Sequence, residues 1–184
     1  SGARLGEAIK FSNIAAGIAV GKIGTAEVSI QEISKFMLDQ DSLSENEKIS
    51  NIKNASNNGK KIVFTNGCFD IIHSGHIKYL EEAKNCGDIL VVGINSDSSV
   101  KKLKGPDRPI INESDRVKVL SSIKYVDFVL VFNDETPLKL IKLIRPDVLV
   151  KGGDYKNKSI VGRSFAKETR TLSFIKNKSS SKII

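Results

Sequence analysis

The sequence predicts an α/β fold with a Rossmann-like, doubly wound parallel sheet of about five strands. From Lys60 onward, short runs rich in Val, Ile, Leu and Phe alternate with amphipathic stretches. Runs that are apolar throughout are typical of strands buried on both faces, and their alternation with helices indicates βαβ units with right-handed crossovers. A chain of 184 residues is long enough for one such domain and a short appendage.

The individual elements follow from the same pattern. The apolar runs predict strands at 60–67, 88–95, 127–132, 147–153 and 171–175. The stretches between them predict helices at 75–86, 112–123 and 136–144. Asn112 and Asp115 suit the start of the second helix, and Pro137 suits the first turn of the third.

Two further segments precede this domain, which we assign to residues 60–184. Residues 1–38 carry Ile9, Ile14 and Ile18 at helical spacing and predict a packed helix. Residues 39–59 are polar and predict a linker carrying one exposed helix. Ser44 and Glu47 there have the spacing of a capping box.

Composition limits the class of protein. The net charge of +8 and the pI of about 9.4 favour anionic partners, although lysine excess also raises solubility. With no Trp and three Tyr, few side chains are available to stack on nucleic acid bases, so nucleic acid is not the expected partner. No stretch approaches the roughly 18 apolar residues of a membrane span, and the N-terminus has no export signal, so we expect a cytoplasmic protein. Cys68 and Cys86 are expected to be reduced thiols, mostly buried.

Both histidines of the chain lie in the stretch TNGCFDIIHSGH, residues 65–76. It follows the first predicted strand and opens the first predicted helix, at the sheet edge where open parallel sheets bind ligands. Free N–H groups at a helix start favour a phosphate, and a spacing of three puts His73 and His76 on one helix face. Gly75 between them lets a ligand approach the backbone. Zinc chelation with Asp70 as third ligand and a purely structural role are the alternatives.

A basic segment, SDSSVKKLKGPDRP at 96–109, follows the second predicted strand. We expect it to be a loop, and its lysines to be either a solvated surface or a mobile clamp over phosphates. Lys101 and Lys104 are the candidates for such a clamp, together with Lys102 and Arg108.

These motifs resemble a known family. GCFDIIHSGH matches the GxFDxxHxGH signature of the cytidylyltransferase-like nucleotidyltransferases, and NSD at 95–97, Arg116 and KGGDY at 151–155 follow in the order of that family. The resemblance covers residues 60–184 and is greatest to the heptose 1-phosphate adenylyltransferase branch. Residues 1–38 are similar to the end of ribokinase-type sugar kinases, which are fused to this domain in that branch. We expect no kinase activity from the segment; an unrelated helical extension is the alternative.

The resemblance implies transfer of an adenylyl group from ATP to D-glycero-β-D-manno-heptose 1-phosphate, giving ADP-heptose and pyrophosphate for the lipopolysaccharide inner core. Mg²⁺ would arrive with ATP, and no metal held by protein side chains is expected. A homodimer is compatible with the resemblance. The alternatives are a cytidylyltransferase that acts on glycerol 3-phosphate and a non-catalytic module that binds nucleotide or nucleic acid.

The resemblance also implies roles for residues. His73 and His76 would stabilise charge on the α-phosphate, with Lys101 and Lys104 over the phosphates. Arg116 would lie at the nucleotide, with pairing to Glu113 as the alternative, and Asp70 would organise its loop. Lys151 or Asp154 would meet sugar hydroxyls or the base. The nucleotide-binding set is Asn66, Gly67, Phe69, Asp70, Gly75, Asp97, Arg116, Gly152, Asp154, Ser179 and Ser180. Lys178 replaces the family's glycine before the serines, and we expect a shortened last helix.

Overall fold

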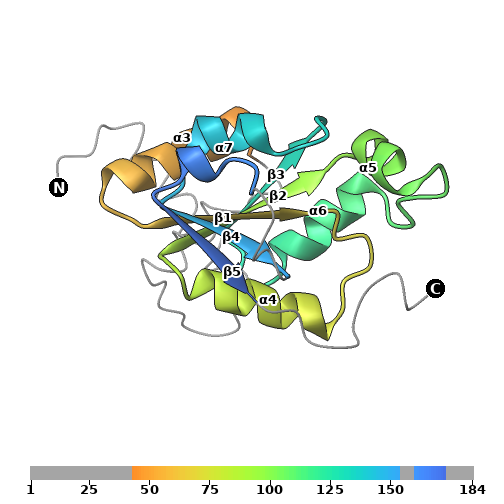
Figure 1. Cartoon of the computed structure of the whole chain (residues 1–184), viewed down its shortest axis with the longest axis horizontal. Helices are drawn as coiled ribbons and strands as arrows, with labels where there is room; N and C mark the ends of the chain where they lie inside the picture. The colour runs from red at the N-terminus through yellow and green to blue at the C-terminus, as the bar shows by residue number, and fades with distance from the viewer. Residues whose placement is uncertain (1–42, 154–159, 173–184) are drawn as a thin grey trace, which may run out of the picture. The chain divides into compact units, whose positions relative to one another are not determined.

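The computed structural model describes residues 43–153 and 160–172 and confirms the α/β fold (Figure 1). Five parallel strands form one sheet in the order β3-β2-β1-β4-β5. The strands are β1 (Ile62–Gly67), β2 (Ile89–Asn95), β3 (Phe128–Phe132), β4 (Val148–Gly152) and β5 (Glu168–Leu172). The chain winds outward from β1 through β2 to β3 and then returns to place β4 on the other side of β1. The strand order therefore reverses between β1 and β4.

The helices cover both faces of the sheet. They are α3 (Glu45–Asn57), α4 (Ser74–Lys84), α5 (Asp97–Lys104), α6 (Glu113–Ser121) and α7 (Leu138–Ile144), with a short 3₁₀ helix η1 (Arg163–Phe165). Side chains of α4 and α6 pack in one buried cluster, and side chains of α3 and α7 pack in a second cluster on the opposite face. None of the helices in 43–153 or 160–172 has the length and hydropathy that a membrane span needs.

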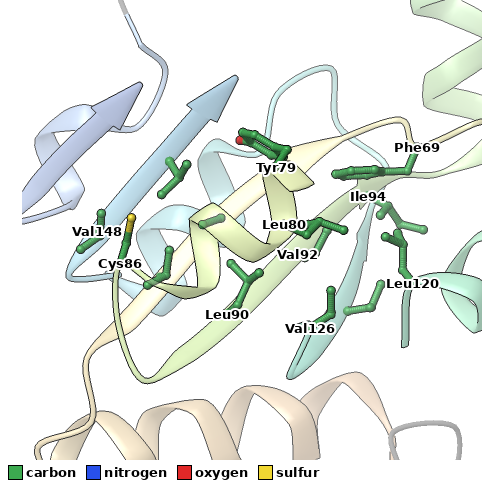
Figure 2. Close-up of a cluster of buried hydrophobic side chains, with 14 residues drawn as sticks. Phe69, Tyr79, Leu80, Cys86, Leu90, Val92, Ile94, Leu120, Val126 and Val148 are labelled. Atoms are coloured by element: carbon green, nitrogen blue, oxygen red, sulfur yellow. The ribbon is translucent and has the colours of Figure 1, made fainter. Parts of the chain in front are cut away.

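Strand side chains alternate between these two clusters, as expected for a sheet buried on both faces. Val63, Leu90 and Val92 lie in the α4 cluster, whereas Phe64 and Val91 lie in the α3 cluster. Figure 2 shows the α4 cluster, in which Phe69 lies near Ile94 and Cys86 lies near Val148. Both cysteines are free; Cys86 is buried and Cys68 is partly buried.

Helix α3 begins as predicted but is not an exposed linker helix. The Ser44 hydroxyl accepts a hydrogen bond from the Glu47 backbone N–H, and the Glu47 carboxylate accepts one from the Ser44 N–H, which completes the capping box. Ile52 is fully buried against the sheet. At the edge strand β3, the Glu45 carboxylate accepts the N–H of Val131. The apolar stripe of α3 is thus part of the core.

Two other predictions need correction. The basic segment expected to be a loop contains helix α5, which begins at an N-cap formed by Ser96 and ends at Gly105, where φ is 104°. The last strand, expected at 171–175, begins three residues earlier, at Glu168, and is a mostly exposed edge. Residues 173–175 and the segment 1–38 lie outside the described residues.

Candidate active site

The candidate site lies at the carboxyl ends of β1 and β4, where the strand order reverses. In open α/β sheets this reversal opens a crevice in which ligands bind, because the connections from the two strands leave in opposite directions. Asn66 and Gly67 end β1, and Lys151 and Gly152 end β4. The two strands are parallel neighbours. The signature loop 68–73 leaves β1 at this point and enters α4.

The histidine pair forms the start of α4. His73 is the N-cap, and its Nδ1 accepts the Gly75 N–H at 3.1 Å. The His76 Nδ1 accepts the His73 N–H at 3.3 Å, so the two histidines make a reciprocal capping box. Their ring centroids are 4.0 Å apart at an interplanar angle of 37°. The two rings thus lie close together, although His73 is the N-cap rather than part of the first helical turn; their binding of one anion stays a prediction.

This capping arrangement fixes which ring nitrogens can meet a ligand. An Nδ1 that accepts a backbone N–H carries no proton, so a neutral ring carries its proton on Nε2. Burial, with added repulsion from His73 and Lys104, lowers the pKa of His76 to about 4. His76 is therefore neutral at pH 7 and presents an Nε2–H donor. Zinc chelation through Nδ1 would require both caps to open.

Phe69 and Gly67 shape the loop beneath the histidines. Phe69 has a positive φ of 47° and is buried, with its ring centroid 5.4 Å from that of His76. A Cβ at Gly67 would lie 3.1 Å from the Phe69 ring, so this position favours glycine. Phe69 therefore packs against His76, and Gly67 leaves room for the Phe69 ring.

Asp70 fastens the signature loop to the segment that precedes α6. Its side chain is buried and accepts hydrogen bonds from Arg108 at 2.6 Å, Ile110 N–H at 2.8 Å and Ile111 N–H at 3.1 Å. Burial alone would raise the pKa of Asp70, but these hydrogen bonds outweigh burial and hold the pKa below its ordinary value. Asp70 was predicted to organise its own loop by accepting backbone hydrogen bonds; its backbone donors instead come from the segment before α6.

The same contacts bear on metal binding. Because both Asp70 oxygens are engaged, Asp70 is not placed to complete a zinc site with the histidines. Within 43–153 and 160–172 there is no group of three His, Cys, Asp or Glu side chains suited to a metal ion. The expectation that Mg²⁺ arrives bound to nucleotide phosphates stays a prediction.

The Arg116 side chain is buried and links several chain segments by hydrogen bonds. Its side chain has no exposed surface. Its guanidinium donates to the carbonyls of Ile111 at 3.0 Å, Cys68 at 2.7 Å and Asn95 at 2.9 Å. The remaining contact is with the Asp97 carboxylate at 2.7 Å. Arg116 thus connects the chain segments that follow β1 and β2 with the segment before α6.

The partner of Arg116 differs from the one expected. Glu113 had been the nearest acidic candidate in sequence, but its carboxylate instead accepts the backbone N–H of Asp97 at 3.3 Å. Asp97 is engaged on both sides, since its own carboxylate pairs with Arg116. Neither Asp97 nor Arg116 is presented to a ligand as a free charge in this arrangement.

The lysines of α5 face solvent. Lys101, Lys102 and Lys104 are exposed and occupy the last turn of the helix, where cations are favourable. Lys104 lies close enough to the histidine pair to act electrostatically on His76. The lysines predicted to form a clamp therefore lie at the end of a helix, and their clamp role stays a prediction.

Lys151 was predicted to meet sugar hydroxyls or the base, but its contact with Asn66 was not predicted from the sequence. Its ammonium donates to the Asn66 side-chain oxygen across the β1–β4 boundary. Burial lowers the pKa of Lys151 to about 8. The strand order expected of a Rossmann-like sheet makes β1 and β4 neighbours, so this contact was available in principle from the pattern.

The structure brings most of the predicted set to one edge of the sheet. Gly75 lies in the first turn of α4 between the histidines, and Gly152 ends β4. The remaining predicted residues, Asp154, Ser179 and Ser180, lie outside the described residues.

Known proteins similar to this chain include curated bacterial relatives. The chain is 48% identical over 190 residues to the bifunctional protein HldE of Nitratiruptor sp. and 50% identical over 190 residues to that of Aliarcobacter butzleri. These matches cover 100% and 98% of the chain but only 41% and 39% of the relatives. The chain therefore spans about two fifths of the length of the curated relatives that it matches.

A solved structure and a family profile also match. The crystal structure of the lipopolysaccharide core biosynthesis protein from Thermoplasma volcanium aligns with a TM-score of 0.52 and 29% identity. The alignment covers 65% of this chain and 100% of that one. The cytidylyltransferase-like profile matches residues 64–184, which include the histidine pair, α5 and the end of β4. The chain belongs to the cytidylyltransferase-like family of nucleotidyltransferases.

Proposed function

We propose that this chain transfers the adenylyl group of ATP to heptose 1-phosphate and releases pyrophosphate. The similarity to HldE proteins at about half identity, and to a protein named for lipopolysaccharide core biosynthesis, supports the sugar substrate. The product would be ADP-heptose. The second activity implied by the word bifunctional would reside in the part of the relatives outside the matched segment, where we expect a sugar kinase domain.

The observation that carries the proposal is the paired histidine cap at the reversal of strand order. The acceptor phosphate is already an anion near neutral pH, so its oxygen attacks the α-phosphorus without needing a general base. A histidine with a pKa of about 4 is a poor base but a good neutral donor. The Nε2–H groups of His73 and His76 are suited to bind the α-phosphate oxygens as negative charge accumulates there.

The remaining charges fit the leaving group. Pyrophosphate separates from the α-phosphorus in line with the attacking oxygen, and its charge must be neutralised. Lys101 and Lys104 are exposed cations in the last turn of α5, and Lys104 acts electrostatically on His76. Mg²⁺ bound to the ATP phosphates would supply further neutralisation.

A pyrophosphate-release assay tests the proposal with ATP or CTP as donor and heptose 1-phosphate or glycerol 3-phosphate as acceptor. We expect release with ATP and heptose 1-phosphate, and the His73→Ala variant serves as the control for contaminating enzymes. A clear preference for CTP would assign a cytidylyltransferase in place of the adenylyl reaction. No release with any pair, although nucleotide still binds, would point to the non-catalytic module.

A further inference from the structure

Lys151 and Asn66 form a polar pair that the reaction described above does not use. They occupy the last two positions of β4 and β1, the strands between which the sheet order reverses. The Lys151 ammonium donates to the Asn66 side-chain oxygen, which holds the ammonium at the carboxyl edge of the sheet. Asn66 itself is partly buried.

The Lys151 side chain is partly buried beside a neutral partner. Burial is the cause that lowers its pKa to about 8. Its hydrogen-bond partner is the neutral Asn66 amide, and no ion pair of Lys151 with a carboxylate occurs within the described ranges 43–153 and 160–172. A partly buried cation that has no counter-ion among these residues is less favourable than a solvated one, and an anionic ligand would relieve this cost.

The positions of the cations suggest which anion that is. In an in-line displacement the attacking and leaving oxygens lie on opposite sides of the phosphorus. The α5 lysines follow β2, on one side of β1, whereas Lys151 ends β4, on the other side. If pyrophosphate leaves toward the two lysines of α5, the acceptor must approach from the β4 side.

We propose that Lys151, positioned by Asn66, binds the phosphate of the acceptor sugar 1-phosphate and directs its oxygen toward the α-phosphorus. This inference rests on the proposed function, since it assigns a specificity residue to the same site. A single cation matches a phosphate monoester, whereas the more highly charged pyrophosphate is matched by the larger cluster on α5.

The test compares wild type with Lys151→Met in steady-state pyrophosphate release, with each substrate varied in turn. Loss of one charge-assisted hydrogen bond should raise KM for heptose 1-phosphate between about 10- and 100-fold, with KM for ATP changed by less than about twofold. Lys118→Met, an exposed lysine on α6, is the matched control and should change neither constant. A larger rise in KM for ATP, or no rise for the acceptor, would overturn the assignment.

Thermal unfolding separates this role from a structural one. Because methionine removes a partly buried charge that no carboxylate of the described residues offsets, Lys151→Met should unfold at the same or a higher temperature than wild type. A lower unfolding temperature would identify Lys151 as a structural residue and would count against the proposal.

Asn66→Asp gives an independent variant in case Lys151→Met does not fold. A carboxylate next to Lys151 would pair with the ammonium and compete with the phosphate, so KM for the acceptor should rise here too. An unchanged KM in a folded Asn66→Asp variant would contradict the proposal.

A direct binding measurement distinguishes failure of this inference from failure of the proposed reaction. Inorganic phosphate is titrated into wild type and Lys151→Met and followed by ³¹P NMR. Weaker binding by the variant would support the phosphate site even if no pyrophosphate were released by wild type. Equal binding would reject the site whatever the reaction.

Discussion

His76 has two ring nitrogens with separate tasks. Nδ1 accepts the His73 N–H and belongs to the helix cap, whereas Nε2 is left to donate to a ligand. Substitutions that remove both nitrogens therefore mix loss of the cap with loss of the donor. An asparagine at this position can still accept the capping hydrogen bond in place of Nδ1. It has no donor at the position of Nε2.

We predict that His76→Asn and His76→Ala both slow turnover by about 100-fold or more, the loss typical of a missing oxyanion donor. Only His76→Ala should also lose about 0.5–2 kcal/mol of stability, because it alone removes the capping acceptor. The measurements are kcat and the free energy of unfolding in urea. Near-normal turnover by His76→Asn would mean that the histidine pair has a purely structural role.

The lowered pKa of His76 predicts how stability depends on pH. Between about pH 4 and 6.5 the unfolded chain binds a proton at this histidine and the folded protein does not. The free energy of unfolding should therefore rise with pH across this interval. It should decrease again as the pH is lowered from about 6.5 to about 4. The lowered pKa of Asp70 acts in a separate interval, below its ordinary value of 3.8.

Urea titrations at pH 4.5, 5.5 and 6.5 would measure this dependence in wild type and in His76→Asn. The variant should show a smaller rise, because it lacks the titrating group. Equal slopes would mean that His76 is not shielded from protonation in the folded state.

Helix α3 has a polar sequence but packs against the core of the domain. Its sequence is mostly polar, but Ile52 is fully buried between the helix and the sheet. Glu45 reaches the edge strand β3, where its carboxylate satisfies a strand N–H that would otherwise be open to another chain. The helix therefore closes one face and protects one edge.

Ile52→Ala should lower the free energy of unfolding by about 2–5 kcal/mol, as expected for a truncated core side chain. Lys53→Ala, the exposed neighbour on the same helix, should change it by less than about 0.5 kcal/mol. Chemical denaturation of the two variants measures the difference. An equally small effect of both substitutions would mean that α3 is a linker helix that adds little to the stability of the core.

Across the whole α/β unit, two buried polar groups hold the site loops in register. Arg116 ties the segments after β1 and β2 to the start of α6, and Asp70 ties the signature loop to the segment around Arg108. These ties cross 38 and 48 residues of sequence. The histidine pair is thus positioned by the tertiary structure around it as well as by its own helix.

Arg116→Met should leave three carbonyls and the Asp97 carboxylate without their donor and cost about 3 kcal/mol or more in the free energy of unfolding. Lys118→Met on the same helix is the exposed control. Arg116→Lys should recover only part of the loss, because one ammonium cannot reproduce the planar set of donors. Full stability of Arg116→Met would show that the site loops hold without this tie.

Local pattern predicted much of the architecture. Alternating apolar runs and helical stretches specified the parallel sheet to within a few residues at β1 through β4, because burial on both faces selects continuous apolar runs. The pattern was less informative at α5, where a short lysine-rich helix resembles a solvated loop, and at β5, whose polar, exposed residues carry no burial signal.

The sequence by itself determined that two neighbouring histidines would lie between a strand and a helix, because that depends on residues three positions apart. Only the tertiary structure decided that Asp97 pairs with Arg116 and that Lys151 meets Asn66, 85 residues away in the chain. Such pairs form because the tertiary structure makes certain strand ends neighbours and because buried charges need hydrogen-bond partners. Neither condition is visible in a local stretch of sequence.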